Sequence, residues 1–352
     1  MSTWWFPGGG AQELKKSEWS SMKRNISIVI GVIVLVAIAA AVLLRNRAPE
    51  TTDHIKGPEK VSVRMKWFFA GTMTGWFAGK EQGIFRTNGI DLSITPGGPD
   101  NNSVKLVAAG SDLFGVAGAD EVLLARAKGI PVVAIGVLFK DSPICFISKK
   151  SKSIRSPKDW SGKTIEVSYG SNAEVQYRAL VAKFQPENMK EVPYTFNLLP
   201  FIEDKVDVSV AYRMDQVVTL ERKGIDLSIM AAKDYGINPY GDVVITTEQT
   251  LKEKADLVRR FMTAVVQSQR WACDNPERAV NDLVAGATSL DKQNELAVWK
   301  ATMPFLLGAD GNAGFCQMQR QRWGDTREVL VKYGGLDPSL EVSSAFTNVL
   351  SK

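Results

Sequence analysis

VSVRMKWFFAGTMTGWFAGKEQGIFRTNGIDLSITPGG, residues 61–98, combines the patterns of a strand, a helix and a second strand. Apolar side chains stand at every second position from Val61 to Trp67, the spacing of a strand with one buried face. Residues 75–86 carry aromatic residues at helical spacing and end at Asn88-Gly89, a helix stop signal. Alternation returns over 90–94, before the turn at 96–99. The stretch therefore predicts a strand–helix–strand unit.

The same rhythm continues along the chain. Strand patterns follow at 113–117, 132–139, 144–148, 164–167, 206–210 and 227–230, and helix patterns at 102–109, 120–128, 156–160 and 172–184. Beyond residue 242 the pattern is helical, over 251–274, 276–285, 292–303 and 317–333. Strands that alternate with helices predict an α/β fold in which helices cover a parallel sheet. A chain of 352 residues exceeds what one core usually holds, so we expect two lobes.

The composition excludes several classes of protein. The 43 basic and 38 acidic residues show no concentrated basic run after residue 60, so nucleic-acid binding is not expected. His54 is the only histidine in the sequence, and it lies in a polar stretch ahead of the first strand. A histidine-dependent triad or zinc centre inside the fold is therefore not expected, and we predict neither a metal nor a cofactor. Three cysteines are too few for a disulfide framework, and whether Cys273 and Cys316 pair stays open.

Residues 26–44 form a long apolar run. A helix over these residues would be about 28 Å long, close to the thickness of a bilayer core. Lys23 and Arg24 precede the run, which favours a cytoplasmic start. We expect residues 1–25 to be an N-terminal tail, 26–44 a transmembrane anchor or signal segment, and 45–60 a linker. Cleavage of the segment and a start at Met1 or Met22 stay open, and either way the main domain lies outside the cytoplasmic membrane.

Four stretches carry a resemblance to a known superfamily. They are 63–67 with 74–85 and 88–92, 97–98 with 106–115, 153–165, and 207–212 with 234–242. In this order they resemble ABC-transporter solute-binding proteins of the superfamily that includes thiamine-pyrimidine-precursor binders, alkanesulfonate and nitrate binders, and a pyrimidine phosphate synthase. The resemblance implies the two-lobe type II periplasmic-binding-protein fold, with a hinge and an interlobe ligand cleft, preceded by one transmembrane helix. Lobe 1 would comprise residues 61–142 plus 238–352, and lobe 2 residues 143–237.

The chain departs from the pattern of the pyrimidine-precursor binders at two places. Their strand-end tryptophan, matched by Trp67, is followed by an asparagine and a histidine, where residues 70–73 here read Ala-Gly-Thr-Met. Their Tyr-x-x-x-Glu motif runs here from Tyr212 to Gln216, so the carboxylate is replaced by an amide and the hydrogen-bond pattern offered to an aminopyrimidine changes. The synthase's cysteine-rich motif and substrate histidine are absent, so the resemblance implies a binding protein that is not an enzyme.

Candidate ligand-binding residues lie where predicted strands end. Open α/β sheets bind ligands at the carboxyl ends of their strands, near the free N–H groups of helix N-termini. Trp67 and Tyr212 match the family, and a flat ring at position 67 suits stacking on a planar ligand. For Asp120 and Ser171 the alternative role is helix capping, and for Gly98 it is an ordinary turn. The full candidate set is Trp67, Thr72, Thr74, Gly98, Asp120, Ser171, Asn172, Tyr212, Asp215 and Gln216.

The expected function is binding without catalysis. The chain would capture a small aromatic or nitrogenous molecule, similar to a pyrimidine thiamine precursor, and deliver it to the permease and ATPase subunits of an ABC importer. Residues 26–44 would hold it to the cytoplasmic membrane, on the periplasmic or extracytoplasmic side. Two alternatives stay open: a membrane-tethered ligand sensor or partner protein, and an enzyme of pyrimidine biosynthesis.

Overall fold

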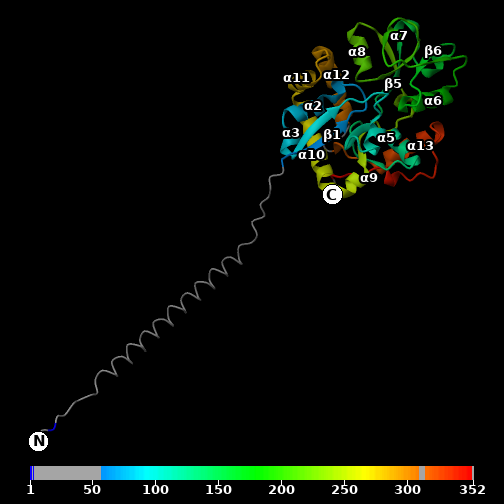
Figure 1. Cartoon of the computed structure of the whole chain (residues 1–352). Coiled ribbons are helices and arrows are strands. Elements are labelled where there is room, and N and C mark those ends of the chain that lie inside the picture. Colours follow the sequence, from blue (N-terminus) through cyan, green and yellow to red (C-terminus); the bar gives the residue numbers. More distant parts are fainter. Residues whose placement is uncertain (2, 4–56, 309–313, 351–352) are drawn as a thin grey trace. The chain divides into compact units, whose positions relative to one another are not determined.

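The first strand, helix and second strand form in the predicted order. The computed structural model describes residues 1, 3, 57–308 and 314–350, and the part from Gly57 onward is one unit (Figure 1). Its first elements are β1 (Glu59–Arg64), the 3-10 turn η1 (Gly71–Met73), α2 (Thr74–Glu81), α3 (Ile84–Thr87) and β2 (Ile90–Thr95). The helix predicted over 75–86 is two helices, because Gly83 adopts a left-handed conformation (φ 71°) that separates them.

The large sheet has five strands in the order β2-β1-β3-β10-β4. Its remaining strands are β3 (Phe114–Gly118), β4 (Val132–Val137) and β10 (Asp242–Thr247). β1 pairs parallel with β2 and β3, whereas β10 lies antiparallel between β3 and β4. The prediction of a parallel sheet is therefore wrong at β10. Val137 at the end of β4 pairs with Val243 near the start of β10. Because β10 enters the sheet where β4 leaves it, β10 runs in the opposite direction.

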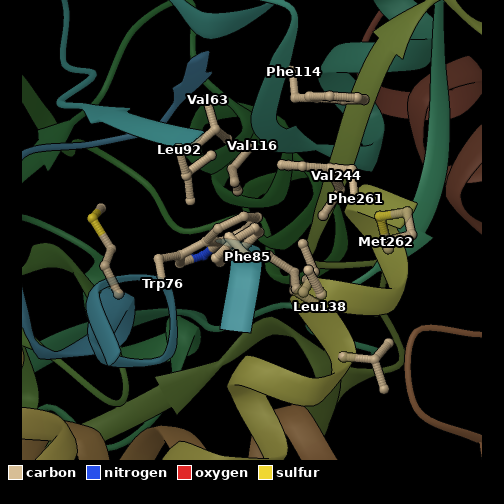
Figure 2. Packing of buried hydrophobic residues seen from close by; sticks show 14 of the residues in the cluster. Val63, Trp76, Phe85, Leu92, Phe114, Val116, Leu138, Val244, Phe261 and Met262 are labelled. Atoms are coloured by element: carbon tan, nitrogen blue, oxygen red, sulfur yellow. The ribbon is translucent and has the colours of Figure 1, made fainter. Parts of the chain in front are cut away.

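One face of this sheet is covered by helices from both ends of the described chain. α10 (Ala255–Asp274) packs on α2, and α11 (Pro276–Gly286) packs on α2 and on α12 (Lys292–Leu307). The rings of Phe114 from β3 and Phe261 from α10 stack with their centroids 3.7 Å apart. Trp76 and Phe85 pack against Phe261 in the same cluster (Figure 2). This aromatic packing fixes α2 and the loop ahead of it relative to the sheet.

The opposite face of the large sheet packs on a second group of helices. They are α4 (Ser103–Ala108), α5 (Ala119–Ala127) and α13 (Arg320–Tyr333). Alternation along β10 serves both faces: Val244 lies in the first cluster, and Val243 and Ile245 lie in the second, with Trp323 of α13. Burial on both faces explains why Val243, Val244 and Ile245 are three consecutive apolar residues in this strand.

The chain between β4 and β10 builds a second, smaller region. β5 (Ile144–Lys149) pairs antiparallel with β8 (Ser209–Tyr212) and β9 (Leu227–Ala231), so the prediction of a parallel sheet is wrong for these three strands as well. β6 (Thr164–Val167) and β7 (Lys190–Pro193) form a parallel pair. The helices here are η3 (Pro157–Trp160), α6 (Asn172–Phe184), α7 (Leu199–Ile202) and α8 (Gln216–Arg222), and Figure 1 shows α7, α8 and β6 together, apart from α9 and α10. We call β1–β4 and β10 with their helices the large region, and β5–β9 with α6–α8 the small region.

Several elements of the small region differ from the sequence prediction. The helix expected at 156–160 is the single 3-10 turn η3, which Ser156 and Asp159 cap reciprocally. The strand expected at 206–210 begins at Ser209. β7, α7 and α8 were not predicted, because four to seven residues are too few to show a clear period.

Two short segments, 138–143 and 237–241, join the regions and bond to each other. The backbone N–H groups of Leu138 and Phe139 both donate to the Asp242 carbonyl, and the side-chain amide of Asn238 donates to Asp141 Oδ1 at 2.8 Å. Contacts of α13 with α6 and of α12 with α8 also connect the regions. The lobe boundaries at 142/143 and 237/238, and a hinge at these segments, stay predictions.

The C-terminal part is helical as predicted, with different helix ends. The helix expected over 251–274 is α9 (Glu248–Glu253) followed by α10, because Lys254 between them has a non-helical backbone (φ −128°, ψ 38°). α12 continues past residue 303 to Leu307, and α13 begins at Arg320 instead of residue 317. Cys145, Cys273 and Cys316 are free thiols, so the pairing left open for Cys273 and Cys316 is not formed.

The expected transmembrane segment at 26–44 lies outside the described residues, as do nearly all of the tail and most of the linker. Among the residues that are described, no helix has the length and apolar character needed to cross a bilayer.

Candidate ligand-binding site

Strand ends from both regions surround a cavity of about 310 Å³. β1 continues into Lys66 and Trp67, and Asp242 at the start of β10 lies in register with Gly118 at the end of β3. These ends meet at one edge of the large sheet, the place where α/β folds hold ligands. From the small region, residues 168–173 and 210–212, together with Tyr194, Phe196, Asp215 and Gln216, contribute to the lining. The volume is within the range of small-molecule pockets.

A buried lysine and two carboxylates form what we call the charged wall: Lys66, Glu121 and Asp242. Lys66 Nζ donates to Asp242 Oδ1 at 2.8 Å and to the Tyr212 hydroxyl at 2.9 Å, and Glu121 Oε2 lies 3.8 Å from it. The side chains of Lys66 and Asp242 are only 15% and 8% exposed. A buried charge is tolerated when it is paired and hydrogen-bonded, as here. Because Tyr212 belongs to the small region, this cluster also links the two sides of the cavity.

Burial and neighbouring charges act in opposite directions on these ionisable groups. Burial alone would lower the pKa of Lys66, but Asp242, Tyr212, Glu121 and Asp120 together outweigh it and raise that pKa well above its usual value. Burial raises the pKa of Asp242, and Lys66 opposes the rise. Burial also raises the pKa of the Tyr212 hydroxyl. Lys66 is thus charged at neutral pH, and its charge is compensated inside the wall.

Aromatic rings from both regions form a second wall, the aromatic wall: Trp67, Phe68, Tyr194 and Phe196. The Trp67 ring lies 5.3 Å from Phe68 and 5.6 Å from Phe196 between centroids, and Tyr194 lies 5.5 Å from Phe196. Phe68 and Phe196 are about half exposed, at 51% and 47%. Phe196 also has a left-handed backbone (φ 60°), a conformation that a bulky residue adopts rarely and that often marks a functional site. The rings offer faces to a planar solute.

Polar side chains complete the lining. Among the described residues, neither the Thr72 hydroxyl nor the Asn172 amide has a hydrogen-bond partner, so both are available to a ligand. The Ser171 hydroxyl accepts from the Ala173 N–H at 3.2 Å and donates to the Ser168 carbonyl at 2.7 Å. Ser171 therefore caps the N-terminus of α6, which is the alternative role considered for it, and it also lines the cavity.

Gly98 lines the cavity for a backbone reason. Its φ of 127° is accessible only to glycine without strain, and a Cβ there would come within 3.0 Å of the Phe68 ring. The glycine therefore lets the loop after β2 pass under an aromatic residue of the wall.

Asp215 and Gln216 follow β8 at the start of α8. Gln216 Nε2 donates to Asp215 Oδ2 at 2.9 Å, and Gln216 Oε1 accepts from the Tyr212 N–H at 2.7 Å. Burial, with a smaller contribution from the charge of Glu295, raises the pKa of Asp215 to about 7. This carboxyl group therefore changes protonation near neutral pH, where it can accept a hydrogen bond from a ligand or donate one.

The part of the sequence that carries this site matches a known family. Residues 71–279 match the family model described as NMT1/THI5 like, which covers more than half of the chain and most of the cavity lining. The chain belongs to the NMT1/THI5-like family. No cluster of three or more histidine, cysteine or carboxylate side chains that could hold a metal is found among the described residues of this family member.

Relatives of this NMT1/THI5-like chain include binding proteins for different solutes. It is 26% identical to the riboflavin-binding protein RibY of Chloroflexus aurantiacus, over 93% of this chain and 97% of that protein. It is 21% identical to the formylaminopyrimidine-binding protein of Halalkalibacterium halodurans, over 90% and 98%. The solved structure of the alkanesulfonate-binding protein SsuA from Xanthomonas axonopodis pv. citri, bound to MOPS, superposes with a TM-score of 0.64, 16% identity, and coverage of 83% and 99%. The chain thus has an α/β periplasmic-binding-protein fold.

Two of the ten candidate residues do not line the cavity of this NMT1/THI5-like chain. Thr74 is fully buried, and its hydroxyl donates to the Gly71 carbonyl at 2.7 Å, which stabilises the start of α2. Asp120 is buried, with Oδ1 accepting from the Glu121 N–H at 2.9 Å, and Glu121 faces the cavity instead. Position at a strand end predicts the neighbourhood, but consecutive residues of a helix point about 100° apart. The candidates that do line the cavity are Trp67, Thr72, Gly98, Ser171, Asn172, Tyr212, Asp215 and Gln216.

The sequence prediction did not include the charged wall, and of the aromatic wall it included only Trp67. Lys66 occupies a polar position of an alternating strand, where a solvent-exposed lysine is the ordinary expectation. Its partner Asp242 lies 176 residues away in the sequence. The only sequence feature that the two residues share is a position next to a strand end. Tyr194 and Phe196 lie in an irregular loop between β7 and α7, where no periodic pattern exists.

Proposed function

We propose that this protein is an extracytoplasmic solute-binding protein that holds a small, neutral, planar nitrogen heterocycle and delivers it to an ABC importer. The observation that carries the proposal is the contrast between the two walls of the cavity. Exposed aromatic rings offer stacking surface, while the lysine that would attract an anion is neutralised by Asp242. The available Thr72 hydroxyl, Asn172 amide and Asp215 carboxyl suit the ring nitrogens and carbonyls of a heterocycle.

The charges of the cavity argue against a sulfonate or nitrate ligand. Lys66 is the only basic residue among the described residues that line the cavity, whereas Glu121, Asp215 and Asp242 are acidic residues of the same lining. Lys66 is paired with Asp242 and lies close to Glu121. An anion would compete with Asp242 for Lys66 and would leave that carboxylate buried without its partner, a costly arrangement. The similarity of fold to alkanesulfonate-binding SsuA therefore does not extend, in our proposal, to its ligand.

Two relatives that match most of this chain support binding without catalysis. RibY and the formylaminopyrimidine-binding protein, each matched over at least 90% of this chain, are both named for a nitrogen-containing ring compound that they bind. We propose that this chain likewise binds a solute of that chemistry and catalyses no reaction on it. Residues 26–44 would tether it to the cytoplasmic membrane, and ABC permease and ATPase subunits would be its partners.

The test is thermal stabilisation of the full chain, purified in detergent, by a panel of pyrimidines, flavins, sulfonates and nitrate. A bound solute at about 100 times its dissociation constant adds about 2.7 kcal/mol to stability, which is easily seen in the melting temperature. We expect stabilisation by a neutral heterocycle and none by sulfonate or nitrate. In Trp67→Ala the affinity for the heterocycle should fall about ten- to a hundredfold, because stacking and apolar burial are both lost.

Phe184→Ala is the matched control, because Phe184 packs edge-on against Tyr235 outside the cavity lining. It removes an aromatic ring and should leave ligand affinity unchanged. Stabilisation by sulfonate or nitrate alone would show that the charge argument is wrong. If no compound stabilises the folded chain, the sensor or partner alternative gains weight.

A further inference from the structure

A second hollow lies on the other side of the aromatic wall. It has a volume of about 350 Å³ and shares five lining residues with the main cavity: Trp67, Tyr194, Phe196, Asp215 and Gln216. Its remaining lining comes from the loop and helix 197–202 and from one side of α8. The two hollows are therefore neighbours, and three aromatic rings and the start of α8 border both of them.

The lining of the second hollow is chemically unlike that of the main cavity. The main cavity has charged groups that are paired with one another, whereas the second hollow has Lys223, an exposed lysine without a hydrogen-bond or ion-pair partner among the described residues. The Thr219 hydroxyl accepts from Asn294 Nδ2 at 3.2 Å, which leaves its own proton free to donate. Asp215 adds an acceptor, because Gln216 occupies only its Oδ2.

These three groups offer donors and an acceptor around an apolar floor. Lys223 and Thr219 stand one helical turn apart on α8, so both side chains lie on one side of that helix. Leu198, Leu199 and Ile202 supply contacts for carbon atoms. Alternating carbon and hydroxyl groups match such a surface, because each hydroxyl can donate to Asp215 and accept from Thr219 or Lys223.

We propose that the second hollow is a subsite for a hydroxylated side chain, so that the ligand is a neutral nitrogen heterocycle that carries a chain of hydroxyl groups. This inference rests on the proposed function, since the ring would occupy the main cavity. The ring stacks on the aromatic wall, and the side chain passes Trp67 and Phe196 into the second hollow. A phosphate at this position is disfavoured, because Asp215 borders the hollow and the negative charge of Glu295 lies close to it.

The experiment compares two probes that share one ring system. Riboflavin carries a hydroxylated chain, and lumiflavin has the same ring system with a methyl group in its place. Quenching of flavin fluorescence gives the dissociation constant of each for the full chain and for two variants, Thr219→Val and Lys223→Met. Lys205→Met is the matched control, because Lys205 is an exposed lysine of the small region outside both hollows.

We expect riboflavin to bind about tenfold more tightly than lumiflavin, the effect of one or two additional hydrogen bonds. Thr219→Val and Lys223→Met should each weaken riboflavin about three- to tenfold and leave lumiflavin unchanged, and Lys205→Met should change neither. Equal binding of the two probes, or equal losses for both in the variants, would overturn the subsite.

Two further outcomes separate this inference from the proposed function. If a pyrimidine of the earlier panel binds and neither flavin does, the proposed function stands and the side-chain subsite is wrong. If riboflavin 5′-phosphate binds more tightly than riboflavin and loses that advantage in Lys223→Met, the subsite takes an anion, and the hydroxyl chemistry proposed here is overturned. If no heterocycle binds at all, both proposals fail together.

Discussion

The charged wall and the aromatic wall border the same cavity but are stabilised in opposite ways. Lys66 and Asp242 are almost completely buried and satisfy each other, so this wall is complete without a ligand. Phe68 and Phe196 are about half exposed, and the strained backbone of Phe196 is not explained by burial. The two walls therefore contribute differently to recognition. The charged wall decides which solutes are excluded, and the aromatic wall supplies contact area that only a bound solute would bury.

The largest effect is expected from breaking the charged wall. Lys66→Met removes the ammonium group and leaves Asp242 buried without its charge partner, so the free energy of unfolding at pH 8 should fall by about 3 kcal/mol. Because burial raises the pKa of Asp242, the loss should be smaller at low pH, where the carboxyl group is protonated. Denaturant titration of the full chain at several pH values measures it.

The double variant Lys66→Met/Asp242→Asn separates charge from packing. It removes both charges, and we expect it to recover more than half of the lost stability. A double variant as unstable as the single one would mean that packing of the lysine stem, and not its charge, holds this wall together.

An intermediate effect is expected at Asp215, which borders both hollows. Its raised pKa of about 7 means that the native state keeps a proton that the unfolded chain loses near pH 4. Its contribution to stability is therefore full below about pH 4 and is lost as the pH rises to about 7. Asp215→Asn should remove this slope and make the variant more stable than the original chain at pH 8.

Ligand affinity gives a second readout for Asp215. If the carboxylate accepts a hydrogen bond from an N–H or O–H group of the ligand, affinity should rise about tenfold between pH 6 and pH 8. The reason is that the ionised fraction of a carboxyl group with a pKa near 7 rises about tenfold over this range. Titration calorimetry of Asp215→Asn should show no such rise. An equal rise in both proteins would assign the titration to another group.

The smallest effect is expected on the aromatic wall when no ligand is present. Phe196→Ala removes a half-exposed ring, so the melting temperature should change by less than about 2 °C. Ligand affinity should fall about three- to tenfold, because one stacking partner is lost. A large loss of stability with unchanged affinity would reverse the roles assigned to the two walls.

Much of the fold could be predicted from local pattern, because most strands and helices are long enough to show their period. Alternation from Val61 to Trp67 and the apolar runs of β3 and β4 marked the core of the large sheet before any contact was known. The antiparallel direction of β10 could not be predicted, because it depends on the return path of the chain from the small region. The short helices α7 and α8 could not be predicted for a different reason, because neither covers more than two turns.

Part of the candidate site was predictable from two sources. Ser171 follows a strand, and strands bring such positions to one edge of a sheet, whereas Trp67 and Tyr212 were predicted chiefly from their match to the family. The burial and pairing of Lys66 could not be predicted, because its partner is distant in the sequence. A lysine at that position of an alternating strand is ordinarily exposed to solvent and unpaired. Thr74 shows the converse error: its hydroxyl is used inside its own helix turn, which sequence position cannot distinguish from a ligand contact.

The place of β10 has a consequence for how the chain folds. β10 pairs with β3 on one side and with β4 on the other, so it is the strand that completes the large sheet. The ribosome nevertheless synthesises it about one hundred residues after β4. Until it arrives, the facing edges of β3 and β4 have unpaired backbone groups and are able to capture other chains. Completion of the large sheet, and with it the placement of Asp242 beside Lys66, must therefore wait for synthesis of the whole small region, so premature termination before residue 242 should yield aggregating fragments instead of half a binding protein.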